Sequence, residues 1–204
     1  MSEDEAKQII DSSDVAYSSW YDDINVNADQ GYYINGKNAV LYGIEETYVT
    51  DIMKYPLEGS YPQNEKEVAL SADAKDLFHV QLGDNILLNT PAGDFNYTIS
   101  GFYEDDEDFN DIIDGTCMYM CRATFDEVRS LNGLESMSRF YVRFKNENGL
   151  KKTITNIKEQ YSLTSENVSE NTPVLSLLGA STNESINALY PLAVACFVII
   201  LIAG

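Results

Sequence analysis

The C-terminal end of the chain, residues 186–204, is a mostly apolar run with no charged side chain after Glu184. Because an α-helix rises ~1.5 Å per residue and the hydrocarbon core of a bilayer is ~30 Å thick, about twenty apolar residues are needed to span a membrane. This run nearly reaches that length and stops without the basic residues that usually flank a membrane helix on its cytoplasmic side. It predicts a truncated transmembrane helix, with the preceding residues forming an ectodomain. A buried core helix is the alternative interpretation.

The chain is strongly acidic, with 33 acidic and 13 basic side chains among its 204 residues and a formal net charge of −20. Such a charge repels phosphates, so it argues against nucleic acid and anionic lipid surfaces as partners and allows a basic partner. Residues 1–121 hold 25 acidic and 5 basic side chains, whereas residues 122–185 hold 8 of each. The sequence therefore divides into two regions of different character.

The cysteines do not form an obvious disulfide framework. Cys196 lies in the apolar run, and Cys117 and Cys121 are separated by three residues. On one strand their Cα atoms would lie ~13 Å apart, too far for a disulfide. We expect free thiols, which do not reveal the redox compartment. The residues after Met1 show neither the basic nor the apolar part of a signal peptide.

The order of hydrophobic patterns predicts a mixed α+β chain. Helices are expected at residues 2–10, 48–53, 71–78, 124–132 and 150–161, and strands at residues 15–21, 32–34, 39–42, 68–70, 86–88, 95–103, 116–120 and 140–144. Two capping-box patterns, Ser2 with Glu5 and Thr124 with Glu127, mark helix starts, and Ser71 is expected to cap the helix after it.

Two hairpins are predicted. Asn35-Gly36 stands between two β-rich runs and is the strongest short hairpin signal. The second hairpin covers residues 86–103, where Phe95, Tyr97 and Ile99 alternate with polar residues and should form the buried face.

Four segments in a fixed order resemble the extracytoplasmic domain of FtsX/MacB-type ABC-transporter permeases. They read PLEG at residues 56–59, NEKEVALS at 64–71, LGD at 82–84 and YTISGFY at 97–103. A further VLSLL at residues 174–178 resembles the loop that precedes a membrane helix in that family, and the match covers about residues 42–204. The order, the spacing and the adjoining apolar run carry the resemblance, since each segment alone is common.

The resemblance implies an α+β fold in which a porter-like lobe is interrupted by a smaller β-rich lobe. Residues 1–62 and 122–185 would form the porter-like lobe and linker, residues 63–121 the inserted lobe, and residues 186–204 the start of the transmembrane helix. It further implies a domain on the extracytoplasmic side of the cell membrane, in a dimeric permease. Such a domain binds or gates a peptide, lipid or protein and couples it to a separate ATPase subunit. A membrane-anchored adhesin or receptor ectodomain is the alternative, and a soluble hydrolase is a third class.

The acidic segment of residues 104–114, EDDEDFNDIID, is the strongest candidate site. Laid on the EF-hand pattern from Asp106 it lacks the required glycine and the closing acid, so a solvated loop is favoured over a calcium site. Weak calcium binding and contact with a basic partner remain alternatives. The candidate partner-contact residues are Asp105, Asp106, Asp108 and Phe109.

No catalytic constellation is predicted. Residues 31–38, GYYINGKN, fall short of a phosphate-binding loop because Asn38 replaces the magnesium-binding hydroxyl, and they suit a hairpin turn better. His79 is the only histidine in the chain. No second histidine is therefore available to build a Ser-His-Asp triad or a zinc site. We expect His79 to pack at a helix end. The chain is therefore predicted to be a non-enzymatic domain without cofactor or metal.

Overall fold

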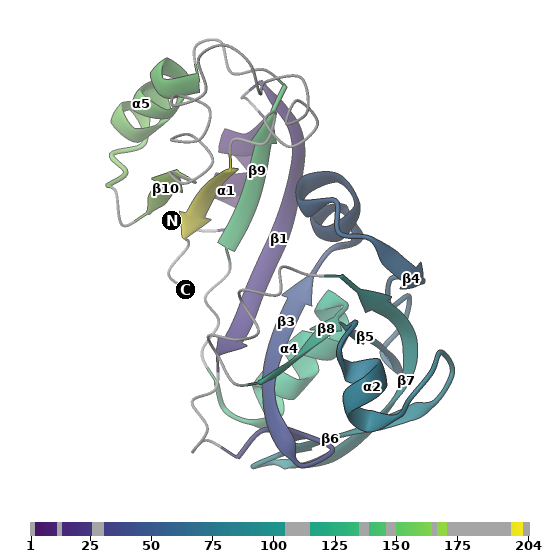
Figure 1. Cartoon of the computed structure of the whole chain (residues 1–204). Helices are drawn as coiled ribbons and strands as arrows, with labels where there is room; N and C mark the ends of the chain where they lie inside the picture. The colour runs from purple at the N-terminus through teal and green to yellow at the C-terminus, as the bar shows by residue number, and fades with distance from the viewer. Residues whose placement is uncertain are drawn as a thin grey trace. The chain divides into compact units, whose positions relative to one another are not determined.

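The structure is a computed structural model that describes residues 3–11, 14–25, 31–104, 115–134, 139–145, 150–164, 167–170 and 197–201. The chain forms two compact units: the first contains Met1–Trp20 and Met137–Gly204, and the second contains Tyr21–Ser136 (Figure 1). The predicted insertion at residues 63–121 lies within the second unit. That unit extends further because strands before residue 63 pair with strands after it.

The first unit combines two helices with a set of strands, of which β10, β11 and β9 pair antiparallel. Its elements are α1 (Glu3–Asp11), the first half of β1 (Val15–Asn25), β9 (Arg139–Phe144), α5 (Leu150–Gln160), β10 (Val168–Glu170) and β11 (Phe197–Leu201). The strands lie in the order β10, β11, β9, β1. Helix α1 buries Ile9 and Ile10, and α5 buries Ile154, whereas Tyr161 just after α5 is exposed.

The predicted transmembrane helix at residues 186–204 is wrong where the structure describes it. Residues 197–201 form strand β11, which pairs antiparallel with β9 on one edge and with β10 on the other. Its sequence, FVIIL, is rich in β-branched residues, and a short apolar run suits a strand with neighbours on both edges as well as a helix. Among the described residues, no helix combines the length and apolar character that crossing a bilayer requires.

The second unit is organised around a sheet that closes on itself. Its elements are the end of β1, β2 (Tyr33–Ile34), β3 (Lys37–Ile44), η1 (Tyr48–Met53), β4 (Leu57–Gly59), β5 (Glu67–Ser71), α2 (Ala74–Phe78), β6 (Asn85–Thr90), β7 (Gly93–Tyr103), β8 (Thr116–Met120) and α4 (Arg122–Leu131). Strands β3, β2, β6, β7, β5 and β8 pair in that order, and β8 pairs again with β3. We call this closed set the ring. Both predicted hairpins are confirmed, as β2–β3 and β6–β7.

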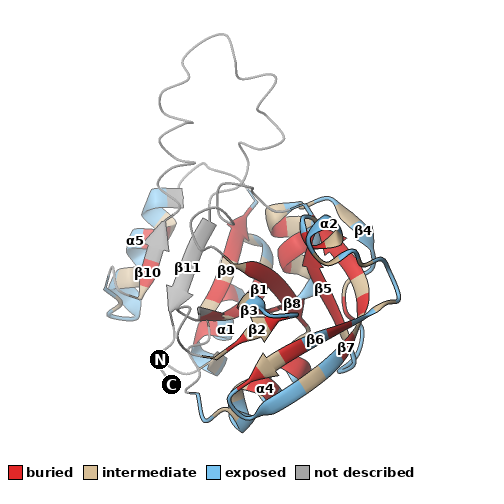
Figure 2. Ribbon diagram, turned by 60° about the horizontal axis from the view of Figure 1, so that its bottom comes forward, coloured by how far each residue is buried: buried red, intermediate tan, exposed pale blue. Residues whose placement is uncertain are grey.

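The core of the second unit lies inside the ring and beneath α4. Every residue of β8 is buried, as are Ile86 and Leu88 of β6 (Figure 2). Helix α4 packs on β3 and β8 and buries Phe125 and Val128. A strand covered on both faces loses the period-2 alternation of a strand with one face in water, which explains why residues 117–120 of β8 are apolar without interruption.

Two predicted helix starts are wrong. Ser71 does not cap a helix, because it is the last residue of β5 and pairs with Tyr103 of β7, and α2 begins three residues later. Thr124 is not an N-cap either: α4 begins at Arg122 after Cys121, and Thr124 is buried in the first turn. In both cases strand pairing and side-chain packing determine where the helix begins, and a local capping pattern carries no information about either.

The register of the β6–β7 hairpin gives a first testable prediction. Tyr97 is 5% exposed, whereas Thr98 is half-buried with its hydroxyl 3.4 Å from Asn85 Oδ1. Tyr97→Ala should lower the free energy of unfolding by ~3–5 kcal/mol, and Thr98→Ala by less than about 1 kcal/mol. Urea unfolding of the two variants measures both values, and equal losses would mean that the register is wrong. Phe95, predicted to be buried, is only half-buried and stacks on Tyr97.

Candidate functional site

The predicted partner-contact residues Asp105, Asp106, Asp108 and Phe109 lie outside the described residues. Their segment follows the end of β7, where the Glu104 amide donates a hydrogen bond to the Pro56 carbonyl at 3.0 Å, and precedes β8. The acidic segment is therefore attached directly to two strands of the ring.

The four motif segments that are separate in sequence meet at one strand, β7. Strand β4, from the PLEG segment, pairs antiparallel with β7 at residues 101–103, and β5, from NEKEVALS, pairs with it in parallel. The LGD turn joins through two hydrogen bonds, from the Gly83 amide to the Ile99 carbonyl at 2.8 Å and from the Ile99 amide to the Asp84 carbonyl at 2.9 Å. The motif thus describes one connected piece of the second unit, which we call the β7 junction.

Two glycines of the β7 junction are required by close backbone contact. A Cβ on Gly59 would lie 2.3 Å from the Ser100 carbonyl oxygen, and a Cβ on Gly101 would lie 2.6 Å from the Ser60 carbonyl oxygen. Gly59 also has φ +88°, a conformation that other residues rarely adopt. Here β4 and β7 approach so closely that any side chain would separate them, so these glycines define the junction.

A shallow recess lies beside the β7 junction. It has a volume of about 420 Å³ and is lined by Gln63, Asn64, Glu65, Lys66, Cys121 and Ala123. The turn at its rim is ordered by hydrogen bonds from the Lys66 amide to Asn64 Oδ1 and from the Gln63 amide to Glu67 Oε2. Cys121 Sγ lies 3.2 Å from Thr124 Oγ1. This mixture of amide and charged groups could contact a small polar group, and sequence reasoning missed it because residues 63–66 and 121–123 meet only through the pairing of β5 with β8.

Five tyrosine rings follow one another in contact inside the second unit, as one stacked, two tilted and one edge-on pair, and we call this series the tyrosine stack. The ring centroids are 5.3 Å apart from Tyr48 to Tyr21, 5.8 Å from Tyr21 to Tyr42, 5.3 Å from Tyr42 to Tyr119 and 5.1 Å from Tyr119 to Tyr103. Such spacings suit offset or edge-to-face aromatic pairs. The stack connects η1, β1, β3, β8 and β7, so it holds elements from the whole second unit in one arrangement.

Buried tyrosines make the protein sensitive to alkali. Burial raises the pKa of Tyr61, Tyr97 and Tyr103 above the ordinary value of 10.0, and the charge of nearby Glu46 adds to the shift at Tyr61 and Tyr103. The folded state therefore keeps phenolic protons at pH values where the unfolded chain loses them. This stabilisation is complete below pH 10.0 and is lost as the pH rises above it.

We expect the urea midpoint to fall steadily above pH 10.0. Tyr103→Phe should reduce the slope, because it removes one of the buried phenols whose pKa is raised in the folded state. Urea titrations of both proteins across this pH range measure the effect. A midpoint that is constant above pH 10.0 in the parent protein would contradict the assignment.

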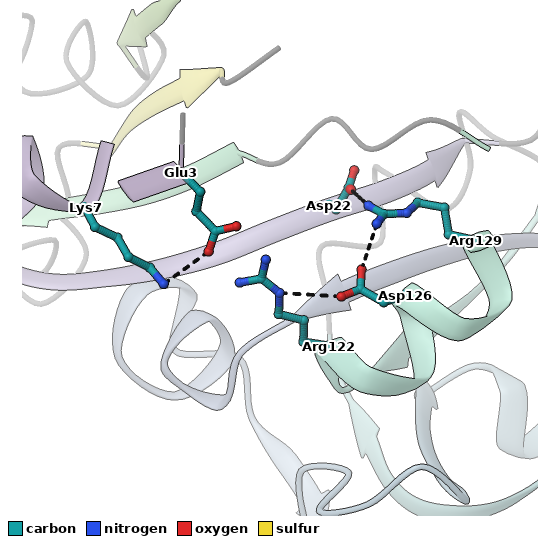
Figure 3. Close-up of polar contacts among 6 residues, drawn as sticks. All are labelled: Glu3, Lys7, Asp22, Arg122, Asp126 and Arg129. Atoms are coloured by element: carbon teal, nitrogen blue, oxygen red, sulfur yellow. Dashed lines mark hydrogen bonds and ion pairs between the residues drawn. The ribbon is translucent and has the colours of Figure 1, made fainter. Parts of the chain in front are cut away.

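A chain of ion pairs ties α4 to β1 (Figure 3). Arg129 Nη1 lies 3.2 Å from Asp22 Oδ2, Arg129 Nη2 lies 3.2 Å from Asp126 Oδ1, and Arg122 Nε lies 3.7 Å from Asp126 Oδ2. The Asp22 side chain is 4% exposed and that of Arg129 is 18% exposed, whereas the side chains of Arg122 and Asp126 are 36% and 39% exposed. Only the Asp22–Arg129 pair is sheltered enough to matter strongly for stability.

The remaining sequence candidates lie apart from one another. His79 does lie at a helix end, as the residue after α2 with φ 54°, but it is exposed rather than packed. Residues 31–38 contain the β2–β3 hairpin turn that the sequence favoured over a phosphate-binding loop. Within the described part of the chain, no group of three or more His, Cys, Asp or Glu side chains is placed to hold a metal ion.

Comparison with known proteins gives a partial likeness to a solved structure. No protein-family model matches the chain, and no curated protein is similar to it. Among solved structures, a similar one is described as "a domain of a putative Permease protein" from Porphyromonas gingivalis. It shares 15% sequence identity and a TM-score of 0.46, over 72% of this chain and 71% of that chain. A likeness of this size assigns neither a family nor an activity to the chain.

Proposed function

We propose that this chain is the extracytoplasmic domain of an ABC-transporter permease of the FtsX/MacB type. In this role it binds or gates a peptide, lipid or protein outside the membrane and couples that event to a separate ATPase subunit. The permease acts as a dimer, and the domain itself has no catalytic activity and needs no cofactor.

The observation that supports this proposal is the β7 junction. The motif segments carry the resemblance through their order in the sequence. They turn out to be neighbours on β7, and two of their glycines stand where a Cβ would lie within 2.6 Å of a carbonyl oxygen. A chance resemblance spread over residues 56–103 would not be expected to select contacting segments. We therefore interpret the four segments as a structural signature of one type of domain.

The acidic charge is the second support, because it concentrates where the motif lies. Residues 21–136 hold 23 acidic and 6 basic side chains, whereas the rest of the chain holds 10 and 7. A field of one sign steers oppositely charged partners toward a surface and repels anions. We therefore place the partner contact on the second unit, at Asp105, Asp106, Asp108 and Phe109, with a basic group on the partner.

A domain of this kind would act by moving rather than by chemistry. A partner that binds one conformation more tightly shifts the population toward it, and a rigid-body shift of a unit can transmit that change to the membrane region. The ring and the tyrosine stack make the second unit suited to move as one body, since its strands are paired in a closed cycle.

Stimulation of ATPase activity in reconstituted membranes tests the proposal. The full-length permease and its ATPase subunit would be compared with the variant Asp106→Asn/Asp108→Asn, using a cationic peptide as probe. We expect basal ATPase activity to be unchanged and peptide stimulation to fall. Deleting residues 63–121 would be less informative than the point substitutions. The deletion removes strands β5, β6, β7 and β8, so β3 loses its partner β8.

The matched control is Asp73→Asn/Asp76→Asn, which removes the same charge from exposed positions of the same unit. It should retain stimulation if the acidic segment is the contact. Equal loss in both variants would assign the effect to overall charge. Failure of the full-length protein to associate with an ATPase subunit would reject the permease proposal and favour a receptor ectodomain.

A further inference from the structure

The chain contains three Asn-Gly dipeptides, at residues 35–36, 132–133 and 148–149, and the last lies outside the described residues. Asn-Gly is chemically reactive because glycine has no side chain to shield its backbone nitrogen from the neighbouring amide carbon. The two described pairs differ in how strongly hydrogen bonds restrain them. What we infer from this difference is independent of the proposed function.

Asn132-Gly133 is locked at the C-terminal end of α4. Asn132 Oδ1 accepts a hydrogen bond from the Ala92 amide at 3.0 Å, and its Nδ2 donates to the Val128 carbonyl at 2.7 Å. The Gly133 amide, which would have to attack, donates to the Ser130 carbonyl at 3.1 Å. Reaction here requires breaking all three hydrogen bonds together.

Asn35-Gly36 forms the exposed tip of the β2–β3 hairpin. Both residues are exposed, with φ 45° and 84°, and no atom within 4 Å would meet a Cβ on Gly36. Among the described residues, nothing accepts a hydrogen bond from the Gly36 amide. Within the described part of the chain the Asn35 side chain makes one hydrogen bond, in which its Oδ1 accepts from the Leu87 amide at a long 3.3 Å.

The hairpin tip is also the least reinforced part of the ring. Strand β2 has two residues, Tyr33 and Ile34, which pair with β3 and with β6. A segment with few ladder hydrogen bonds and an exposed backbone opens locally at lower free energy than the core does. Opening gives Asn35 and Gly36 the freedom to reach the geometry of attack without unfolding the unit.

We propose that Asn35 is a site of spontaneous deamidation and isomerisation in the folded protein. The Gly36 nitrogen attacks Cγ of Asn35, a new C–N bond closes a five-membered imide, and the bond from Cγ to Nδ2 breaks. Nδ2 leaves as ammonia, carrying the proton that the Gly36 nitrogen gives up. Water then opens the imide at either carbonyl, which yields aspartate or isoaspartate without any change of oxidation state.

The product changes the hairpin that bears it. Isoaspartate routes the backbone through the former side chain, so that Tyr33 and Asn38 can no longer keep their pairing across a two-residue turn. It also adds a negative charge to an acidic unit and disturbs the hydrogen bond from the Asn35 amide to the Leu87 carbonyl. Modification at Asn35 should therefore loosen the attachment of β2 to β6.

Site-resolved peptide mapping by mass spectrometry tests the proposal. The protein is aged in mildly alkaline buffer, once folded and once in urea, and the conversion of amide to acid is followed at each Asn-Gly pair. In urea the three pairs should react at similar rates. In the folded protein Asn132 should be slowed by about tenfold or more relative to urea, and Asn35 by less than about threefold.

Two further measurements sharpen the result. Asn35→Ser should abolish the fast conversion and leave the Asn132 rate unchanged. The aged fraction that carries isoaspartate at residue 35 should melt below the unmodified protein. Equal slowing of Asn35 and Asn132 by folding, or no slowing of either, would overturn the proposal.

Discussion

Gly59→Ala is expected to lower the free energy of unfolding by ~3–5 kcal/mol, whereas Gly83→Ala should lower it by only about 1–2 kcal/mol. The two glycines have nearly the same backbone conformation, with φ +88° and +85°, so both substitutions incur the same left-handed strain. They differ in their surroundings. A Cβ on Gly59 would lie 2.3 Å from the Ser100 carbonyl oxygen, and a Cβ on Gly83 would meet nothing within 4 Å.

Urea unfolding of both variants of the 204-residue chain measures the difference. Gly101→Ala should resemble Gly59→Ala, because its Cβ would lie 2.6 Å from the Ser60 carbonyl oxygen. Equal losses for Gly59→Ala and Gly83→Ala would show that β4 does not approach β7 as closely as described, and the β7 junction would lose its support.

Arg129→Ala should cost about 3 kcal/mol or more, while Arg122→Ala on the same helix should cost less than about 1 kcal/mol. Removing Arg129 deprives the nearly buried Asp22 carboxylate of its ion-pair partner at 3.2 Å. Arg122, by contrast, is 36% exposed and lies 3.7 Å from an exposed carboxylate, so solvent already screens the pair.

Comparing the two arginine variants distinguishes the loss of a sheltered ion pair from the loss of a positive charge on α4. Thermal or urea unfolding gives both stabilities, and raising the salt concentration should diminish the Arg122 effect while leaving most of the Arg129 effect. A loss for Arg129→Ala that salt abolishes would mean that Asp22 is accessible to water. Asp22→Asn should restore part of the stability of Arg129→Ala, since it removes the negative charge that Arg129 neutralises in the parent protein.

The sequence by itself determined most elements of this protein. The Asn35-Gly36 signal and the alternation of Tyr97 and Ile99 predict hairpins that the structure contains, because turn chemistry and a half-buried strand leave local traces. The order of four short segments also selected residues that lie together, although it gave no indication of how they meet.

Only the tertiary structure decided which strands pair and where helices begin. Ring closure joins β3 to β8, which are separated by more than seventy residues, and no local pattern encodes such a contact. Residues 197–201 show the limit most clearly. Their apolar, β-branched sequence suits either a membrane helix or a strand with neighbours on both edges, and pairing with β9 and β10 selected the strand. The recess beside Cys121 and the Asp22–Arg129 pair likewise exist only because distant segments meet.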